Sequence, residues 1–305
     1  MRIIFMGTPD FAVASLQALL EAGENVVAVV TVADKPAGRG QKIQESAVKK
    51  FAVSNNIPVL QPVKLKDEHF LAALKSFNAD LQVVVAFRML PEVVWNMPPK
   101  GTINLHASLL PQYRGAAPIN HAIINGEKES GVTTFLLQHQ IDTGNILFKE
   151  TVSIAATDTA GDLHDKLMAV GAQLLIKTVG AIKNGKHQEI PQEEIINNVE
   201  LKHAPKIFKE DCKIIWDKPL QEVYNLIRGL SPYPTAFTDF QGKILKIFKC
   251  TPLKDTTNEQ PGSFISDGKH YLRFAAKGGY IDVTEVQLEG KRRMSVEEFL
   301  RGVRI

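Results

Sequence analysis

The sequence predicts a two-domain protein of the α/β class, in which a mostly parallel, doubly wound sheet is followed by a small β-barrel. Three observations carry this prediction. Wholly apolar strands alternate with amphipathic helices over residues 2–183, a polar stretch with two prolines follows at 185–205, and short strands separated by glycine turns fill residues 206–305. Alternating strands and helices are typical of a parallel sheet, whereas closely spaced short strands are typical of a barrel.

The elements of the first domain follow from two periodicities. Residues 2–6 and 26–32 are almost entirely apolar, as expected of strands that are covered on both faces. Between them, residues 11–22 repeat apolar side chains at helical spacing and stop at Gly23. The same alternation predicts further helices at 47–54, 68–77, 119–124 and 160–183, and further strands at 59–60, 81–86, 102–106, 132–137 and 145–150.

The second domain is predicted from its turns. Strands are expected at 244–248, 262–265, 271–275 and 281–288. Asp267-Gly268 and Gly278-Gly279 lie where hairpin turns are needed, a helix is expected at 221–228, and Ser295 with Glu298 offers a capping box for a last helix. We therefore place the first domain at residues 1–184, a linker at 185–205 and the second domain at 206–305.

The composition excludes several classes of protein. Of the 305 residues, 44% are hydrophobic and 23% are charged, which is typical of a globular chain. The longest apolar runs, such as residues 26–33, are too short to span a bilayer, and the N-terminus lacks signal-peptide architecture. Cys212 and Cys250 are too few for a structural zinc site and indicate free thiols in a reducing compartment. We expect a cytoplasmic protein without a metal, and a monomer because no apolar interface segment stands out.

Positive charge is concentrated in the last third of the chain. Residues 206–305 contain 17 Lys and Arg against 13 Asp and Glu, a net charge of +4, whereas the other residues contain 19 against 20, a net charge of −1. Six basic residues there are candidates for one basic face: Lys243, Lys246, Lys249, Lys291, Arg292 and Arg293. With Lys35, Arg39 and Lys42 in a basic loop after the second strand, they favour a long anionic partner, although solvated charges are the alternative.

Asn104 and His106 are the strongest candidates for chemistry. They lie two residues apart on a predicted strand, so both side chains leave the same face. Ligands of open α/β sheets bind outside the carboxyl ends of the strands, and a Pro- and Gly-rich loop follows this strand at once. The amide suits donation to a carbonyl oxygen and the imidazole suits proton transfer. The alternative is a core Asn and His whose hydrogen bonds are satisfied internally.

Asp142 is the third candidate, between two predicted strands. It is either a turn former, as the following Gly144 suggests, or the partner of His106. In the second case the three polar side chains together polarise a carbonyl group and move protons. Gly7-Thr8-Pro9 is a tight turn and no dinucleotide site, since it is not G-x-G-x-x-G and Pro9 lacks a backbone donor.

Several stretches match the pattern of a known family. They are Gly7-Thr8-Pro9-Asp10-Phe11, Lys35-Pro36-Ala37-Gly38-Arg39-Gly40, Asn104-Leu105-His106, Ser108-Leu109-Leu110-Pro111, Tyr113-Arg114-Gly115, Asp142-Thr143-Gly144 and Pro232-Tyr233-Pro234. With them the chain resembles the methionyl-tRNA formyltransferases over essentially its whole length. The resemblance implies a Rossmann-like formyltransferase domain followed by an OB-like barrel. It also implies transfer of the formyl group of 10-formyltetrahydrofolate to the α-amino group of methionyl initiator tRNA.

The resemblance also assigns roles to residues. Asn104, His106 and Asp142 would be the catalytic residues: Asn104 donates to the formyl oxygen, His106 held by Asp142 relays a proton to N10, and Asp142 takes a proton from the amine. The folate pocket would be lined by Ser108, Leu109, Leu110, Pro111, Phe87, Arg88, Met89, Leu90, His139 and Gln140. Lys35, Arg39, Lys42 and Arg114 would contact the tRNA.

One segment departs from the family pattern. After Ala86 the family commonly reads Tyr-Gly-x-Ile-Leu-Pro, whereas this chain reads Phe87-Arg88-Met89-Leu90-Pro91, one residue shorter and without the glycine. Arg88 is a charge at the expected pocket wall, where the glutamate tail of the folate or a tRNA phosphate is its candidate partner.

Three other functions fit parts of the sequence. A formyltransferase acting on a small amine, such as an amino sugar nucleotide or glycinamide ribonucleotide, would share the three polar residues but has less use for the basic loop and barrel. A 10-formyltetrahydrofolate hydrolase would use the same residues with water in place of the amine. A non-catalytic RNA-binding protein would need only the barrel and leaves Asn104, His106 and Asp142 unexplained.

Overall fold

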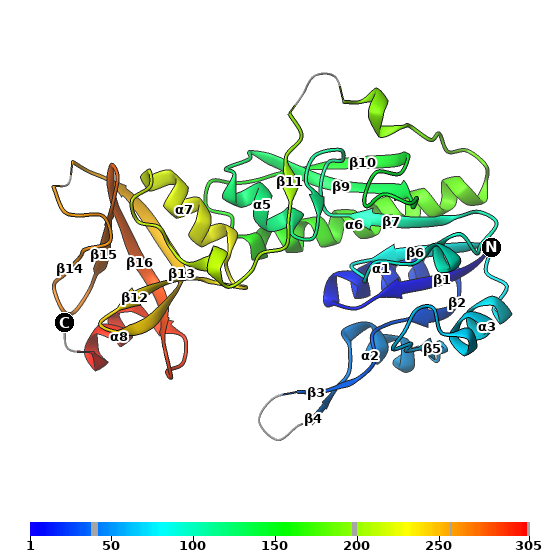
Figure 1. Cartoon of the computed structure of the whole chain (residues 1–305), viewed down its shortest axis with the longest axis horizontal. Helices are drawn as coiled ribbons and strands as arrows, with labels where there is room; N and C mark the ends of the chain where they lie inside the picture. The colour runs from blue at the N-terminus through cyan, green and yellow to red at the C-terminus, as the bar shows by residue number, and fades with distance from the viewer. Residues whose placement is uncertain (38–41, 197–199, 257, 304–305) are drawn as a thin grey trace. The chain divides into compact units, whose positions relative to one another are not determined.

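The structure is a computed structural model that describes residues 1–37, 42–196, 200–256 and 258–303 (Figure 1). The chain forms two compact units. The first contains residues 1–115, 130–152 and 164–203, and the second contains residues 116–129, 153–163 and 204–305. By packing, the short segments 116–129 and 153–163 therefore group with the C-terminal part of the chain. The division at 184 and 206 stays a prediction about where the domains begin and end.

The first unit is built on a seven-stranded sheet, as predicted for a doubly wound α/β domain. Its strands follow the order β10-β9-β7-β6-β1-β2-β5. Their bounds are Arg2–Gly7 for β1, Asn25–Val30 for β2, Val59–Leu60 for β5, Leu81–Val85 for β6, Thr102–His106 for β7, Glu129–Leu136 for β9 and Ile146–Ser153 for β10. The five strands β7, β6, β1, β2 and β5 run parallel, and β9 is antiparallel to β7.

Helices cover both faces of this sheet. Their bounds are Asp10–Glu21 for α1, Ala47–Ser54 for α2, Glu68–Ser76 for α3, Glu92–Trp95 for α4 and Ala160–Lys183 for α6. Ile4 and Met6 of β1 pack with Phe70 and Leu74 of α3, while the alternating residues, such as Phe5, are equally buried on the other face. Gly171 lets α6 approach β7, since a Cβ there would lie 3.0 Å from a methyl group of Leu105. The apolar run at residues 3–6 of β1 therefore did indicate a strand buried on both faces.

The sequence prediction missed a hairpin after β2. β3 (Lys35–Ala37) and β4 (Lys42–Gln44) form a separate two-stranded antiparallel sheet where a loop was expected. Lys and Ala are depleted in strands, and Pro36 cannot donate to a ladder, so the local sequence does not predict pairing. At the root of the hairpin, Lys49 of α2 forms an ion pair with Asp34.

The second unit is an antiparallel sheet with three helices, and the predicted barrel-like fold is confirmed. Its strands are β12 (Ala236–Phe240), β13 (Lys243–Lys254), β14 (Phe264–Ser266), β15 (Leu272–Ala276), β16 (Gly279–Leu288) and β17 (Met294–Ser295), and its helices are α5 (Pro118–Ile124), α7 (Leu220–Gly229) and α8 (Val296–Gly302). The expected turns lie at Asp267 and Gly278, and the Ser295 hydroxyl caps α8 by accepting from the Glu298 N–H at 3.2 Å.

Short elements complete the chain. They are β8 (Arg114–Gly115), β11 (His203–Ala204), and the 3-10 turns η1 (Gln192–Glu194) and η2 (Glu210–Cys212). Of the helices that the structure describes, none combines the length and the apolar character needed to cross a bilayer.

Arg228 ties the separate segments of the second unit together. Its side chain is buried, and it donates hydrogen bonds to the carbonyl oxygens of Asp158 at 2.9 Å and Ile123 at 3.4 Å and to the Asn225 amide oxygen at 2.9 Å. Burial lowers the pKa of this guanidinium. The Arg228 side chain on α7 thus bonds backbone carbonyl groups of both short segments, 116–129 and 153–163. These bonds help to explain why the two segments pack with the C-terminal part of the chain.

Replacing Arg228 by Met should destabilise the second unit. The apolar side chain keeps most of the volume but removes the Arg228 donors from the carbonyl oxygens of Asp158 and Ile123 and from Asn225 Oδ1, which costs about 1–3 kcal/mol of unfolding free energy. Urea denaturation followed by circular dichroism measures the change. Arg301→Met, at an exposed position of α8, is the control and should be nearly neutral. Equal stabilities of the two variants would show that Arg228 does not hold the segments.

Candidate active site

Asn104 and His106 lie at the carboxyl end of β7, as the sequence predicts. In the sheet, Asn104 is opposite Val84 of β6 and Phe135 of β9, and His106 is opposite Thr133 of β9. The His106 side chain is 8% exposed, while Asn104 is half-buried. Within the described part of the chain, the Asn104 side-chain amide has no hydrogen-bond partner. A half-buried amide without a partner at a sheet edge is a donor available to a ligand.

The backbone fixes which nitrogen of His106 is protonated. His106 Nε2 lies 2.9 Å from the carbonyl oxygen of Tyr113. A carbonyl oxygen only accepts, so Nε2 carries the hydrogen and donates it. In neutral imidazole the other nitrogen, Nδ1, therefore holds the lone pair that can take up a proton.

Asp142 faces this second nitrogen. Its Oδ2 lies 3.9 Å from His106 Nδ1 and accepts a hydrogen bond of 3.0 Å from the backbone N–H of Gly115. The Asp142 side chain is 13% exposed, and its backbone adopts φ = 54°, in the left-handed region that Asp tolerates. The carboxylate thus faces the His106 nitrogen that the Tyr113 carbonyl leaves unengaged. The structure places Asp142 against His106, which the turn-former alternative did not require.

Gln192, which the sequence analysis placed in a linker, holds the Asp142 loop. Its buried Nε2 donates to the carbonyl oxygens of Asp142 and Gly144, each at 2.9 Å, and its Oε1 accepts from Arg114 Nε at 3.0 Å and Nη2 at 2.6 Å. Burial lowers the pKa of the Arg114 guanidinium, and the carboxylates of Glu193 and Asp142 oppose that effect. No local pattern singles out Gln192, because its partners lie up to 78 residues away in the sequence.

A hydroxyl group of β9 holds the loop that follows β7. Thr133 Oγ1 is buried; it donates to the carbonyl oxygen of Ser108 at 2.6 Å and accepts from the backbone N–H of Leu110 at 3.1 Å. Ser108 Oγ donates to the carbonyl oxygen of Gln112 at 2.7 Å, and Leu110 packs in a small core with Phe135 and Ile146. No sequence pattern singles out Thr133, since threonine is common in strands.

The other segments expected to form a folate pocket lie side by side. His139 Nε2 is 3.5 Å from Glu92 Oε1, and the His139 ring meets Trp95 edge-on at 5.4 Å, so the loop after β9 lies against the segment 87–95. The remaining predicted lining residues there differ in exposure: Phe87 and Leu90 pack in the core, whereas Met89 and Gln140 are exposed.

Arg88 does not extend into an open pocket. Its guanidinium donates to the backbone carbonyl oxygens of Pro62 and Val63, and it lies over the Phe87 ring at 5.6 Å. Burial lowers its pKa. In the structure Arg88 therefore fastens the loop before α3 to the segment after β6.

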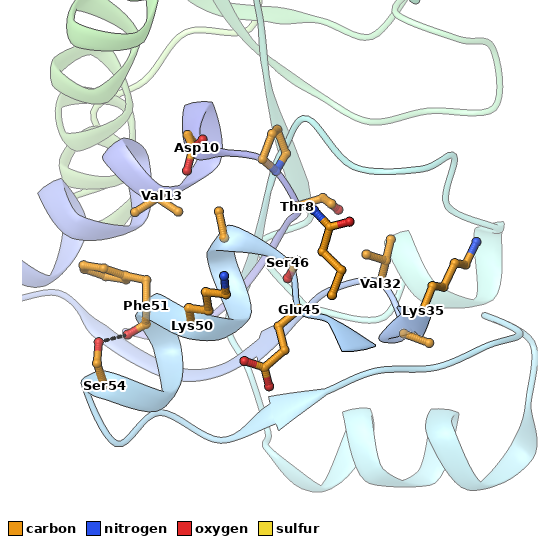
Figure 2. Close-up of a pocket in the computed structure, with 14 residues that line it drawn as sticks. Thr8, Asp10, Val13, Val32, Lys35, Glu45, Ser46, Lys50, Phe51 and Ser54 are labelled. Carbon is orange, nitrogen blue, oxygen red and sulfur yellow. Dashed lines mark hydrogen bonds between the residues drawn. The ribbon is translucent and has the colours of Figure 1, made fainter. Parts of the chain in front are cut away.

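A cavity of about 820 Å³ opens at the carboxyl ends of β1 and β2 (Figure 2). Thr8 lies in the turn before α1 and Asp10 begins that helix, Ser46 caps α2 and Lys50 lies on it, and Lys35 begins β3; all five line the cavity. Of the other predicted basic residues, Arg39 lies outside the described residues, and Lys42 is described only by its backbone in β4.

In the part of the chain that the structure describes, no three His, Cys, Asp or Glu side chains are grouped as metal ligands would be.

Two family models match the chain. The model described as "Formyl transferase" matches residues 1–179, and the model described as "Formyl transferase, C-terminal domain" matches residues 206–304. Methionyl-tRNA formyltransferase of Bacteroides fragilis is 55% identical over 99% of this chain and 95% of its own length. The enzyme of the same name from Flavobacterium johnsoniae is 52% identical over 99% of this chain and 96% of its own length.

Solved structures share the fold at lower identity. WlaRD, a sugar 3N-formyl transferase solved with dTDP and 5-N-formyl-THF, superposes with a TM-score of 0.68 at 23% identity and covers 96% of this chain and 99% of its own. HypX from Aquifex aeolicus in complex with tetrahydrofolic acid gives a TM-score of 0.68 at 18% identity and covers 99% of this chain and 48% of its own. At such identities the similarity establishes the fold alone.

Gly144 is required by space at the site, which gives a direct prediction. A Cβ at this position would lie 1.6 Å from the carbonyl oxygen of Leu136, so Gly144→Ala must push the 142–144 loop away. We expect a loss of about 1–3 kcal/mol in unfolding free energy and a displaced Asp142. Gly180→Ala on α6 is the control, because its Cβ meets nothing within 4 Å and should be neutral or stabilising. Thermal melts and a crystal structure of each variant test this; an unmoved Asp142 in Gly144→Ala would contradict it.

Proposed function

This chain belongs to the formyl transferase family, and we propose that Asn104, His106 and Asp142 carry out its reaction. The reaction moves the formyl group of 10-formyltetrahydrofolate to the α-amino group of methionyl initiator tRNA, as in the full-length relatives that carry this name. The observation that supports the assignment most strongly is the His106–Asp142 pair, 3.9 Å apart, at the same strand end as the unpartnered Asn104 amide.

The available groups fit a formyl donor. When bound, 10-formyltetrahydrofolate supplies a carbonyl carbon that an amine can attack. The Asn104 side-chain N–H donors are unused within the described residues, so they can donate to the oxygen of that carbonyl. Such a donor contributes most as the oxygen gains negative charge, because its position is fixed in advance by the sheet.

His106 and Asp142 suit the proton transfers. Because His106 Nε2 donates its hydrogen to the carbonyl oxygen of Tyr113, Nδ1 is the nitrogen that can take up or release a proton. Nδ1 faces the Asp142 carboxylate. A proton carried on Nδ1 can pass to the departing N10 of the folate. Asp142, directly or through water, then takes a proton from the attacking amine, so the pair handles both transfers without a change in its total charge.

The basic residues suit the tRNA. Lys35 lines the cavity of Figure 2, and Lys50 lies across from it, so the walls at the carboxyl ends of β1 and β2 can meet phosphates. We propose that Arg39, Lys42 and Arg114 add to this surface, although two donors of Arg114 are engaged with Gln192. We infer in addition that the enzyme acts as a monomer in the cytoplasm, where translation begins.

An assay with purified components tests the function. Methionyl initiator tRNA and 10-formyltetrahydrofolate are mixed with the protein, and formyl-methionine on the tRNA is measured. Formate release without an acceptor would instead indicate a hydrolase, and formylation of a dTDP-linked amino sugar in preference to the tRNA would indicate a small-amine transferase.

The variants Asn104→Ala and His106→Ala should each slow single-turnover formylation by about 10²–10³-fold, because each removes a group that acts on the developing charge or proton. Affinity for the tRNA, measured by filter binding, should be retained. His69→Ala, exposed on α3, is the control and should keep the wild-type rate. Near-normal rates for both site variants would refute the assignment.

Thr133→Val should weaken binding of the formyl donor. The variant removes the hydroxyl that fixes Ser108 and Leu110, so we expect a higher KM for the donor and a loss of about 1–3 kcal/mol in stability. The neighbouring Thr134→Val is a matched control, because Thr134 is equally buried but bonds Thr178 of α6 at 2.8 Å. It should lose stability without a change in KM. An equal change of KM in both variants would mean that the Ser108–Leu110 loop has no specific role.

A further inference from the structure

Gln192 occupies a position that its sequence context does not suggest. It opens the short turn η1 in the segment 185–205, and its relative exposure is 0%. The segment lies along the first unit, because Ile190 pairs with Ile146 of β10 and the carbonyl oxygen of Lys202 accepts from the Tyr113 N–H at 2.6 Å. Gln192 is therefore fixed within the same unit as the catalytic residues.

The Gln192 amide uses its full hydrogen-bonding capacity. An amide oxygen has two lone pairs and an amide NH₂ has two hydrogens. Here the oxygen accepts twice from Arg114, and the nitrogen donates to the carbonyl oxygens of Asp142 and Gly144. Since the side chain is buried, water cannot replace these bonds when they are lost.

These bonds close a ring around Asp142. Gln192 holds the Asp142 carbonyl from one side, and Arg114 holds Gln192. The residue after Arg114 is Gly115, whose N–H donates to the Asp142 carboxylate at 3.0 Å. Main chain and side chain of Asp142 are thus fixed by two routes that meet at residues 114–115, while Asp142 itself is held at φ = 54°.

We propose that Gln192 is a positioning residue of the active site, which keeps the Asp142 carboxylate against His106 by clamping the carbonyl groups of Asp142 and Gly144. The inference rests on the proposed function, since it assigns Gln192 a role in the same transfer. Among the described residues Gln192 forms no hydrogen bond with His106, so in this proposal its effect on the transfer runs through Asp142, and its bond to Arg114 is tested separately below. A displacement of about 1 Å at a reacting group costs on the order of 10²-fold in rate.

Two substitutions separate the contacts of Gln192. Gln192→Ala removes all four hydrogen bonds. Gln192→Glu keeps an acceptor for Arg114 but places an oxygen without a hydrogen 2.9 Å from two carbonyl oxygens, which repels the loop. If the carbonyl clamp is what matters, both variants slow single-turnover formylation by about 10–100-fold at saturating donor and tRNA. Full activity in Gln192→Glu would show that the bond to Arg114, and not the clamp, is required, and would overturn the proposal.

A double-mutant cycle with Asp142→Asn tests whether Gln192 affects the formylation rate through the Asp142 carboxylate. A residue that works only through the Asp142 carboxylate has little left to contribute once that carboxylate is gone. We therefore expect Gln192→Ala to slow the wild-type enzyme but to change the Asp142→Asn enzyme little. Equal fold-losses in both backgrounds would mean a general structural effect and would overturn the inference. Gln173→Ala, exposed on α6, controls for removal of a glutamine from the same unit.

A crystal structure of Gln192→Ala provides a readout that needs no activity. We expect the 142–144 loop to shift and the Gly115 contact to lengthen, while Asn104 and His106 stay in place on β7. An unmoved Asp142 would refute the inference, even if Asp142→Asn were too slow to measure. The assay of the wild-type enzyme separates failure of the proposed function from failure of the inference about Gln192. A wild type that forms no formyl-methionine refutes the proposed function. An active wild type whose double-mutant cycle shows additive effects refutes only the role of Gln192.

Discussion

The site depends on a backbone stretch of three residues, Tyr113 to Gly115. The carbonyl oxygen of Tyr113 fixes the His106 ring and its tautomer, and the N–H of Gly115 fixes the Asp142 carboxylate. Tyr113 and Gly115 both adopt positive φ angles, of 60° and 127°. Such angles are costly for a residue like Tyr and persist only where the surroundings determine them. This strained backbone orients two side chains from different parts of the chain, those of His106 and Asp142.

Each unit engages an arginine by the same means: Arg114 is half-buried in the first unit, and Arg228 is buried in the second. Arg114 in the first unit and Arg228 in the second have their pKa values lowered by burial, and each directs its donors to neutral oxygens, an amide in one case and backbone carbonyls in the other. Charged donors make stronger hydrogen bonds than neutral ones, which offsets the cost of removing them from water. The result is that distant chain segments are joined at one point: 114 with 192, and 228 with 123 and 158.

The sequence predicted what depends on local periodicity, and it missed what depends on distant contacts. Apolar strands, helix ends and the i, i+2 relation of Asn104 and His106 are properties of neighbouring residues, so the sheet and the strand end were predicted well. Asp142 was left between two roles, because only its 3.9 Å approach to His106 distinguishes them. Gln192 was hidden in a polar stretch that looks like a linker. Arg88 looked like a ligand-binding charge, yet it donates to the backbone carbonyl oxygens of Pro62 and Val63, which lie 26 and 25 residues away in the sequence.

The choice of a neutral side chain at Gln192 has an electrostatic reason. A lysine or arginine at this position could also donate to the carbonyls of Asp142 and Gly144, but its charge would act on the nearby carboxylate as strongly as it held the loop. An amide supplies two donors without a net charge. It therefore fixes the position of Asp142 without placing a further charge beside the carboxylate.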